Sequence, residues 1–153
     1  MSEAIQDSIV VQAMTSNLHA VREFMTRHVK ASALLDRDKS KVVLAVDEAV
    51  ANIVKHAYQM TGTGEVQIRV RFDDRKFEVF VYDSGIRFDP GAVKSPDMGE
   101  HVRLGKKTGL GIFLMRQIMD EVLYNFREGS KNELHLIKYV DPPTEQPKGP
   151  SPV

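Results

Sequence analysis

Two neighbouring runs of alternating apolar and polar residues, 66–72 and 77–82, constrain the fold of this chain more than any other feature. An alternation with a period of two puts every second side chain on the same face of a β-strand. Only Asp73, Asp74 and Arg75 separate the two runs, and such a short polar connection is typical of a hairpin. We therefore expect a pair of antiparallel strands here.

Helical periodicity marks two segments before the hairpin, 18–30 and 40–58. Their apolar residues recur every three or four positions, which collects them on one side of a helix. These residues are Leu18, Val21, Phe24, Met25 and Val29 in the first segment, and Val42, Val46, Ala49, Val50, Ile53 and Ala57 in the second. Ser16 or Asn17 is suited to cap the first helix, and the charged segment 36–41 is interpreted as a connection.

One more helix and three more strands complete the predicted domain. The helix is expected over 109–119, and the strands over 9–14, 121–126 and 134–140. This order of elements predicts an α+β fold, a two-layer sandwich with helices packed on one face of a mainly antiparallel sheet. A chain of 153 residues suits one domain, here residues 1–140.

The composition excludes several classes of protein. Lys plus Arg and Asp plus Glu are both 21, and this zero net charge argues against a broad basic surface for nucleic acid. There is no cysteine for disulfides or thiolate metal sites, and the five histidines lack a metal-binding spacing. The sequence contains no long apolar run and no signal-peptide pattern, so we expect a cytoplasmic protein that does not contact a membrane. Residues 141–153 contain five prolines and are expected to be a disordered tail.

The first candidate for chemistry lies on the long helix. At about 100° per residue, Glu48, Asn52 and Lys55 fall within an arc of roughly 60°, away from the apolar stripe. The simplest interpretation is a solvated helix face. The alternative is that the amide oxygen of Asn52 ligates Mg²⁺, while Glu48 accepts a proton or aligns a nucleophile.

The second candidate, Asp83-Ser84-Gly85, follows directly after a predicted strand. An Asp followed closely by a Gly is often only a turn. The alternative is an adenine site, in which the carboxylate of Asp83 accepts a hydrogen bond from the adenine amino group. Gly85 would then allow the backbone to come close to the base.

The third candidate, 108–111 (TGLG), opens a predicted helix after the long irregular stretch 83–107. Free backbone N–H groups and the helix dipole favour an anion at a helix N-terminus, although most such glycine pairs are ordinary turns. Arg103, Lys106 and Lys107 make the preceding stretch basic where phosphates would lie. The P-loop, dinucleotide-binding and protein-kinase glycine patterns are each incomplete in this sequence.

In this order the three candidates resemble the nucleotide-binding boxes of the GHKL superfamily of ATPases. Within it they are most similar to the anti-sigma factor serine/threonine kinases. Residues 46–52 (VDEAVAN) with 56–58 (HAY) are similar to the first box, 81–85 (VYDSG) to the second, and 108–115 (TGLGIFLM) to the third. The likeness extends over about residues 8–140.

The resemblance implies a histidine-kinase-like ATPase fold and a role for each residue. Asn52 would hold Mg²⁺, Glu48 would be the catalytic carboxylate and Asp83 would bind adenine. The other residues expected at the nucleotide are Lys55, Gly85, Arg103, Lys107, Thr108, Gly109, Leu110 and Gly111. Segment 89–107 would form an ATP lid, and Arg87 stands where the fuller superfamily pattern has glycine. Lys55 is either an additional phosphate contact or a surface lysine.

The resemblance also implies a function. The chain would bind Mg-ATP, phosphorylate a Ser or Thr of an anti-sigma factor antagonist protein, and bind a sigma factor as a homodimer. Two alternatives are a non-catalytic ATP-gated switch and a detached histidine-kinase catalytic domain. Glu48 favours a kinase over the switch, because a protein that only binds has no chemical need for a carboxylate there. The short chain and the HAY segment favour it over the histidine-kinase domain.

Overall fold

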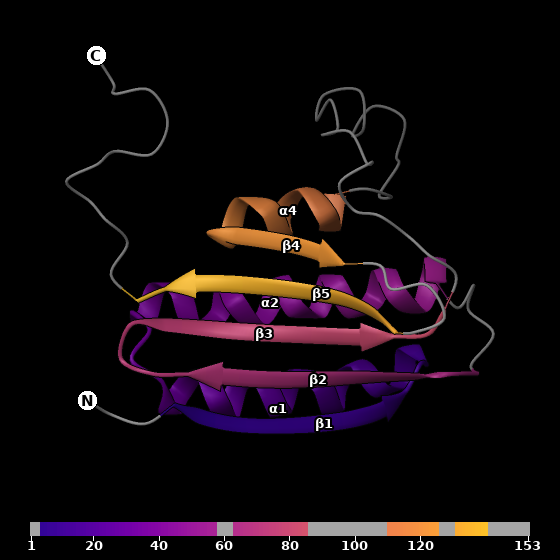
Figure 1. Cartoon of the computed structure of the whole chain (residues 1–153), viewed down its shortest axis with the longest axis horizontal. Helices are drawn as coiled ribbons and strands as arrows, with labels where there is room; N and C mark the ends of the chain where they lie inside the picture. The colour runs from indigo at the N-terminus through magenta and orange to yellow at the C-terminus, as the bar shows by residue number, and fades with distance from the viewer. Residues whose placement is uncertain (1–3, 58–62, 86–109, 126–130, 141–153) are drawn as a thin grey trace, which may run out of the picture.

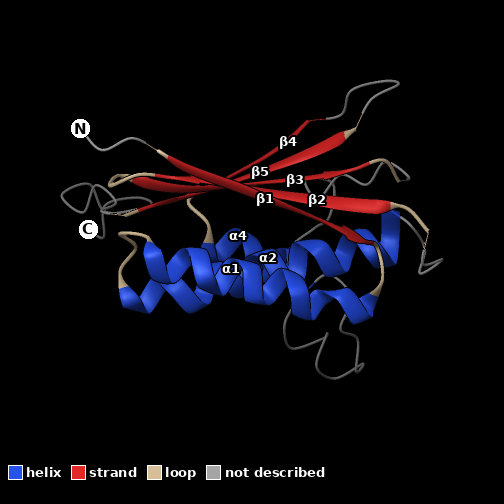
Figure 2. Cartoon of the chain, turned by 90° about the horizontal axis from the view of Figure 1, so that it is seen from below, coloured by secondary structure: helices blue, strands red, loops and turns tan. Residues whose placement is uncertain are grey.

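The computed structural model describes residues 4–57, 63–85, 110–125 and 131–140, which form two layers (Figure 1). One layer is a five-stranded antiparallel sheet with the strand order β1-β2-β3-β5-β4. The other layer consists of helices that cover one face of this sheet, and no described helix covers the opposite face (Figure 2). The α+β sandwich expected from the sequence is therefore confirmed.

The strands are β1 (Ile5–Gln12), β2 (Glu65–Phe72), β3 (Lys76–Asp83), β4 (Glu121–Asn125) and β5 (Asn132–Tyr139). β2 and β3 form the predicted hairpin, with Ile68 opposite Val81. β5 inserts between β3 and β4, so that Val81 also lies opposite Leu134. The middle of the sheet thus joins strands that are far apart in the sequence.

The helices are α1 (Leu18–Ala31), α2 (Asp36–Asn52) and α4 (Leu110–Ile118), with a short 3-10 turn η1 (Thr15–Asn17) before α1. α2 packs against both α1 and α4, which makes it the central helix of its layer. The chain continues beyond α2 as a π-helical turn, η2 (Ile53–Ala57), and Tyr58, the predicted end of the helix, lies outside the described residues.

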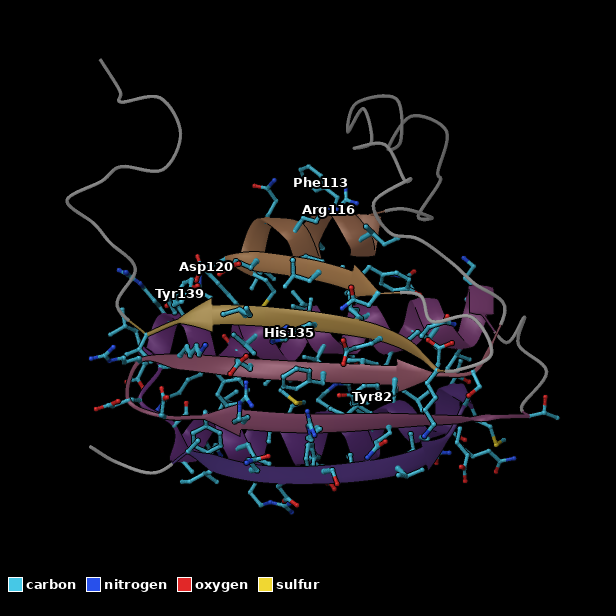
Figure 3. All side chains as sticks on the ribbon, viewed as in Figure 1. Tyr82, Phe113, Arg116, Asp120, His135 and Tyr139 are labelled. Atoms are coloured by element: carbon cyan, nitrogen blue, oxygen red, sulfur yellow. The ribbon has the colours of Figure 1, made fainter. Side chains whose placement is uncertain are left out.

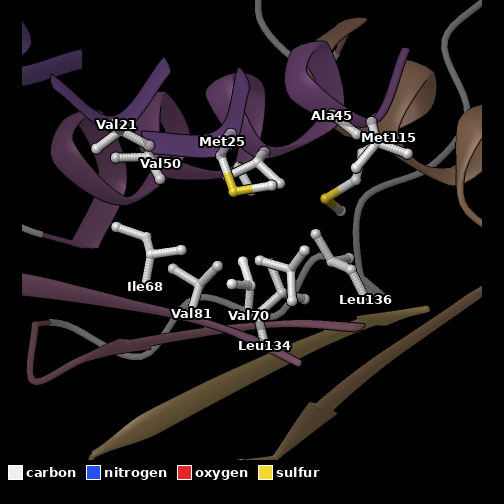
Figure 4. Packing of buried hydrophobic residues seen from close by; sticks show 14 of the residues in the cluster. Val21, Met25, Ala45, Val50, Ile68, Val70, Val81, Met115, Leu134 and Leu136 are labelled. Carbon is white, nitrogen blue, oxygen red and sulfur yellow. The ribbon is translucent and has the colours of Figure 1, made fainter. Parts of the chain in front are cut away.

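The core lies between the two layers and is almost entirely apolar (Figure 4). Alternate strand residues such as Ile68, Val81 and Leu136 are fully buried and face the helices, where Met25 and Val50 are buried against them. Burying one such side chain contributes about 1.5–3 kcal/mol relative to leaving it exposed. The contact between the layers therefore determines how α2, α4 and the strand ends lie relative to one another.

The interpretation of segment 36–41 as a connection was wrong, because α2 already begins at Asp36. The segment carries no apolar stripe, so its helical character is invisible to periodicity. Its stabilisation is electrostatic instead: Asp36 and Asp38 occupy the first turn, where the helix dipole favours negative charge. Lys39 Nζ also lies 3.3 Å from Asp36 Oδ1.

The first strand is also displaced from its predicted range of 9–14, since β1 runs from Ile5 to Gln12. The first half of β1 is exposed and, apart from Ile5, polar, so it shows no alternation in the sequence. Pairing with β2 defines its range instead, beginning with Ile5 opposite Phe72.

The predictions for the second half of the chain are accurate where they can be compared. The predicted helix 109–119 and strands 121–126 and 134–140 correspond to α4, β4 and β5 to within a few residues. The expected lid, 89–107, and the expected tail, 141–153, lie outside the described residues. Across the part of the chain that the structure describes, every helix is too short or too polar to cross a membrane.

Candidate functional site

The C-terminal end of α2 places Asn52 between the two layers. This half-buried residue lines a small cavity together with Ile112 and Met115 of α4 and Leu134 of β5. Its Nδ2 atom is fully buried and has no hydrogen-bond partner among the described residues. With the amide nitrogen turned inward, Oδ1 is the atom of this side chain that remains available to a ligand.

Glu48 lies one helical turn before Asn52 and is half-buried. Burial raises the pKa of Glu48 above its ordinary value of 4.5, and the neighbouring charge of Asp47 raises it further. A raised pKa makes a carboxylate a better proton acceptor. Lys55, in η2, is exposed. Glu48 and Asn52 are thus partly shielded from water, and only Lys55 fits a fully solvated face.

The end of β3 places Asp83 on the helix-facing side of the sheet, where it is only 2% exposed. The backbone N–H of Gly85 donates to Asp83 Oδ1 at 2.9 Å, and Asn132 Nδ2 donates to the same oxygen at 3.0 Å. Asn132 Nδ2 also donates to the carbonyl oxygen of Gly85 at 3.3 Å. These residues form a closed hydrogen-bonded unit at the end of the sheet.

The carboxylate of Asp83 is buried without a cationic partner among the described residues. Burial raises the pKa of Asp83 above its ordinary value of 3.8, and the hydrogen bonds from Asn132 and Gly85 offset part of this effect. A desolvated carboxylate is costly, and such groups in folded proteins are concentrated at ligand sites. Both hydrogen bonds end on Oδ1, so Oδ2 takes part in neither.

The beginning of α4 brings the third candidate to the same region. Leu110 is the first residue of α4 and Gly111 the second, and the next residue, Ile112, shares a cavity with Asn52. The remaining candidates lie outside the described residues: Arg103, Lys107, Thr108 and Gly109. Asn52 and the beginning of α4 thus share a cavity with Leu134, which lies two residues along β5 from Asn132, the hydrogen-bond partner of Asp83.

No motif in the sequence marks Asn132, although it contacts Asp83 directly. The two residues are 49 positions apart, and only the pairing of β3 with β5 sets them opposite each other. The one available signal is a break in pattern. The inner face of β5 is apolar at Leu134 and Leu136, and at Asn132 it carries a buried amide instead.

The described residues fit a magnesium ion only in combination with phosphate oxygens. Nowhere in the described ranges do three or more His, Cys, Asp or Glu side chains gather as a metal site would require. Mg²⁺ is usually held by one or two protein oxygens together with substrate phosphates and water. Asn52 Oδ1 is suited to be such a protein oxygen.

The sequence matches the family described as histidine kinase-like ATPase domain over residues 11–138. It is 37% identical over 102 residues to the serine-protein kinase RsbW of Listeria monocytogenes serovar 1/2a, covering 64% of each protein. It is 36% identical over 116 residues to the serine-protein kinase RsbW of Staphylococcus aureus strain MRSA252, covering 72% of this chain and 71% of the relative. The chain thus spans 64% of the length of the Listeria relative, just under two thirds.

Proposed function

This chain belongs to the histidine kinase-like ATPase domain family, and we propose that it is an anti-sigma factor-type protein kinase. It binds Mg-ATP and transfers the γ-phosphate to a Ser or Thr of an anti-sigma factor antagonist protein. The observation that carries this proposal is the buried carboxylate of Asp83, which has no cationic partner among the described residues and keeps one oxygen out of its hydrogen bonds. The name serine-protein kinase borne by the matched relatives supports it.

The base of the nucleotide binds at the end of β3. Asp83 Oδ2 accepts a hydrogen bond from the adenine amino group, because Oδ1 is already used by Gly85 and Asn132. Gly85 has no side chain to block the approach of the base to the turn after β3. Burial removes the water that would otherwise hydrogen-bond the carboxylate of Asp83. The adenine amino group takes the place of that water as a donor, which favours the ionised form of the carboxylate.

The phosphates bind between α2 and the beginning of α4. Asn52 Oδ1 ligates Mg²⁺, whose charge helps to neutralise the phosphate oxygens. The exposed ammonium group of Lys55 lies on the same helical segment and adds a phosphate contact. The other phosphate contacts are the basic residues Arg103 and Lys107 and the segment Thr108, Gly109, Leu110 and Gly111.

Glu48 serves as the proton acceptor of the transfer. The substrate hydroxyl oxygen forms a bond to the γ-phosphorus, and the bond from that phosphorus to the bridging oxygen of ADP breaks. The hydroxyl proton passes to the carboxylate of Glu48. The half-buried position of Glu48, one turn from Asn52, and its raised pKa both support this role.

The proposed partners come from the resemblance of the sequence to the anti-sigma factor serine/threonine kinases. We infer that the kinase is a homodimer that binds a sigma factor and exchanges it for the antagonist protein according to the bound nucleotide. Such a regulator works in the cytoplasm, where sigma factors meet their polymerase.

A transfer assay tests this function. Purified protein is incubated with ATP labelled in its γ-phosphate and with antagonist proteins from the same genome, and the modified residue is mapped by mass spectrometry. We expect label on a Ser or Thr of one antagonist, and none with Asn52→Ala, which should not bind Mg-ATP. Nucleotide binding without transfer to any antagonist would support the non-catalytic switch. Label on a histidine would support a detached histidine-kinase domain.

A further inference from the structure

The side chain of Asn132 is oriented by its surroundings. Its amide nitrogen lies between two acceptors, Asp83 Oδ1 at 3.0 Å and the carbonyl oxygen of Gly85 at 3.3 Å. An acceptor needs a donor, and only the nitrogen end of an amide carries hydrogens, so chemistry determines which end of the Asn132 amide faces this pair. The carbonyl oxygen of Asn132 therefore points away from both acceptors.

Two acceptor atoms remain unused at this end of the sheet. Asn132 Oδ1 and Asp83 Oδ2 accept no hydrogen bond from any described residue. Neither is among the fully buried unpartnered atoms of the described residues, although the two residues are only 6% and 2% exposed. Asp83 lies directly opposite Asn132 in the pairing of β3 with β5. A ligand that reaches Asp83 therefore meets a second acceptor beside it.

We propose that Asn132 is a specificity-determining residue for the base, whose carbonyl oxygen accepts one amino hydrogen of adenine while Asp83 accepts the other. The proposal rests on the proposed function, because it requires adenine to bind at Asp83. An exocyclic amino group carries two hydrogens, so two neighbouring acceptors match adenine. Guanine presents a carbonyl oxygen at that position, which would leave both acceptors without a donor.

The hydrogen bonds of Asn132 also keep the two acceptors in place. Through one nitrogen it ties the carboxylate of Asp83 to the turn at Gly85, so neither acceptor is free to rotate toward a different base. A site built to bond a particular hydrogen rejects an analogue that lacks it, because the polar groups of the site are then left unpaired. Asn132 thus both orients the carboxylate of Asp83 and accepts a hydrogen bond from the base.

The first test uses the wild-type protein and needs no variant. The affinities of Mg-ATP, Mg-GTP and the magnesium complex of N6-methyl-ATP, which keeps one amino hydrogen, are measured by titration calorimetry. We expect N6-methyl-ATP to bind about two- to tenfold more weakly than ATP, as the loss of one hydrogen bond implies. GTP should bind more weakly still. Equal affinity for ATP and N6-methyl-ATP would overturn the proposal.

The second test separates hydrogen bonding from the bulk of the methyl group. Asn132→Leu keeps a side chain of similar size but removes the carbonyl acceptor. The ratio of the ATP affinity to the N6-methyl-ATP affinity should therefore fall toward one in this variant. Asn132→Ala provides the same comparison if the leucine variant does not fold. The matched control is Asn125→Leu, on β4, where an exposed asparagine donates to Glu133 Oε1 at 3.0 Å. This control should keep the wild-type ratio.

The outcomes distinguish this inference from the function on which it rests. If the wild-type protein does not bind Mg-ATP, both are overturned. If it binds Mg-ATP and the ratio is the same in the wild-type protein and the folded Asn132 variants, the methyl group acts by its bulk. In that case only the role of Asn132 is overturned, and Asp83 keeps its place in the site.

Discussion

β3 carries two carboxylates that are equally buried and yet differ in almost every other respect. Glu78 and Asp83 are each 2% exposed. Glu78 lies on the face of the sheet that no described helix covers, and Asp83 lies on the face that packs against the helices. The pKa of Glu78 is lowered and that of Asp83 is raised, so burial alone does not decide how either carboxylate behaves.

Glu78 is bound by two cationic side chains and a histidine. Arg71 donates from Nε to Glu78 Oε1 at 3.0 Å, Lys76 Nζ lies 3.7 Å from the same oxygen, and His135 Nε2 bonds Oε2 at 2.8 Å. Burial raises the pKa of Glu78, but the hydrogen bonds from Arg71 and His135 outweigh this and hold it below its ordinary value of 4.5. Both oxygens of Glu78 are therefore engaged by side chains of the sheet itself.

Stacked rings adjoin this ion cluster through His135, which Figure 3 labels together with Tyr82. The ring of Phe80 stacks on His135 at 4.2 Å between centroids, and the guanidinium carbon of Arg69 lies 4.6 Å from the Phe80 ring. Phe80 also stacks on Tyr82 at 6.4 Å. The protein itself thus compensates the charge on the open face. On the helix-facing side it leaves an oxygen of Asp83 outside the hydrogen bonds of the described residues, and our proposal that Asp83 binds a ligand rests on this contrast.

The largest expected effect is on the rate of phosphate transfer, when the proposed proton acceptor Glu48 on α2 is replaced. Glu48→Gln keeps the size of the side chain but cannot accept the hydroxyl proton, so phosphate transfer should slow by about 10²–10⁴ while Mg-ATP still binds. Single-turnover transfer at saturating ATP measures this. Asp74→Asn, in the exposed hairpin turn, is the control and should behave like the wild type. Transfer at the wild-type rate by Glu48→Gln would rule out its role.

Asp83→Asn should weaken adenine nucleotides while the fold is retained. The new amide oxygen can still accept from Gly85 and Asn132, whereas its nitrogen would face the adenine amino group as a second donor. The loss of that hydrogen bond implies an affinity about five- to 150-fold lower for ATP. Calorimetry with ATP and GTP checks this, and an equal loss for the two nucleotides would argue against adenine at Asp83.

Glu78→Gln should show the opposite behaviour. It leaves Arg71 and His135 without their charged partner, which should lower the free energy of unfolding by about 1–3 kcal/mol. ATP affinity should stay at the wild-type value, since Glu78 lies on the other face of the sheet. Urea unfolding and calorimetry on the same variant measure the two quantities. A large loss of ATP affinity in a folded variant would break the contrast between the two faces.

The smallest expected effect is the pH dependence of stability. Glu78, with a lowered pKa, stabilises the fold above its unfolded value of 4.5, and this contribution is lost as the pH falls through its folded value. Asp83, with a raised pKa, binds its proton more tightly in the folded state. Its contribution therefore decreases as the pH rises above 3.8 through its folded value.

Measuring the free energy of unfolding of each variant between about pH 3 and pH 7 tests the directions of these two pH dependences. The free energy of unfolding of Glu78→Gln should lie below that of the wild type, and the gap should shrink as the pH is lowered. Asp83→Asn should gain in relative stability as the pH is raised. For each variant, the free energy of unfolding is compared with that of the wild type. If this difference changes in the same direction with pH for both variants, the two carboxylates do not have opposite pKa shifts.

Much of the fold was determined by local patterns in the sequence. Alternation predicted the hairpin of β2 and β3, and helical spacing predicted α1 and most of α2, because burial on one face imposes these periods on neighbouring residues. The same patterns missed the first turn of α2 at Asp36, where charge rather than burial stabilises the helix. The boxes at Glu48, Asn52 and Asp83 were also visible, since each is a short run of adjacent residues. Arg103 and Lys107 remain predictions from the sequence.

Only the tertiary structure decided which of these residues meet. The insertion of β5 between β3 and β4 sets Asn132 against Asp83 on the inner face and His135 near Glu78 on the outer face. A shift of one residue in that pairing would move each of these β5 side chains to the other face of the sheet. Register depends on hydrogen bonds and packing between strands far apart in the chain. No local period encodes it, and the sequence alone therefore left Asn132 unmarked.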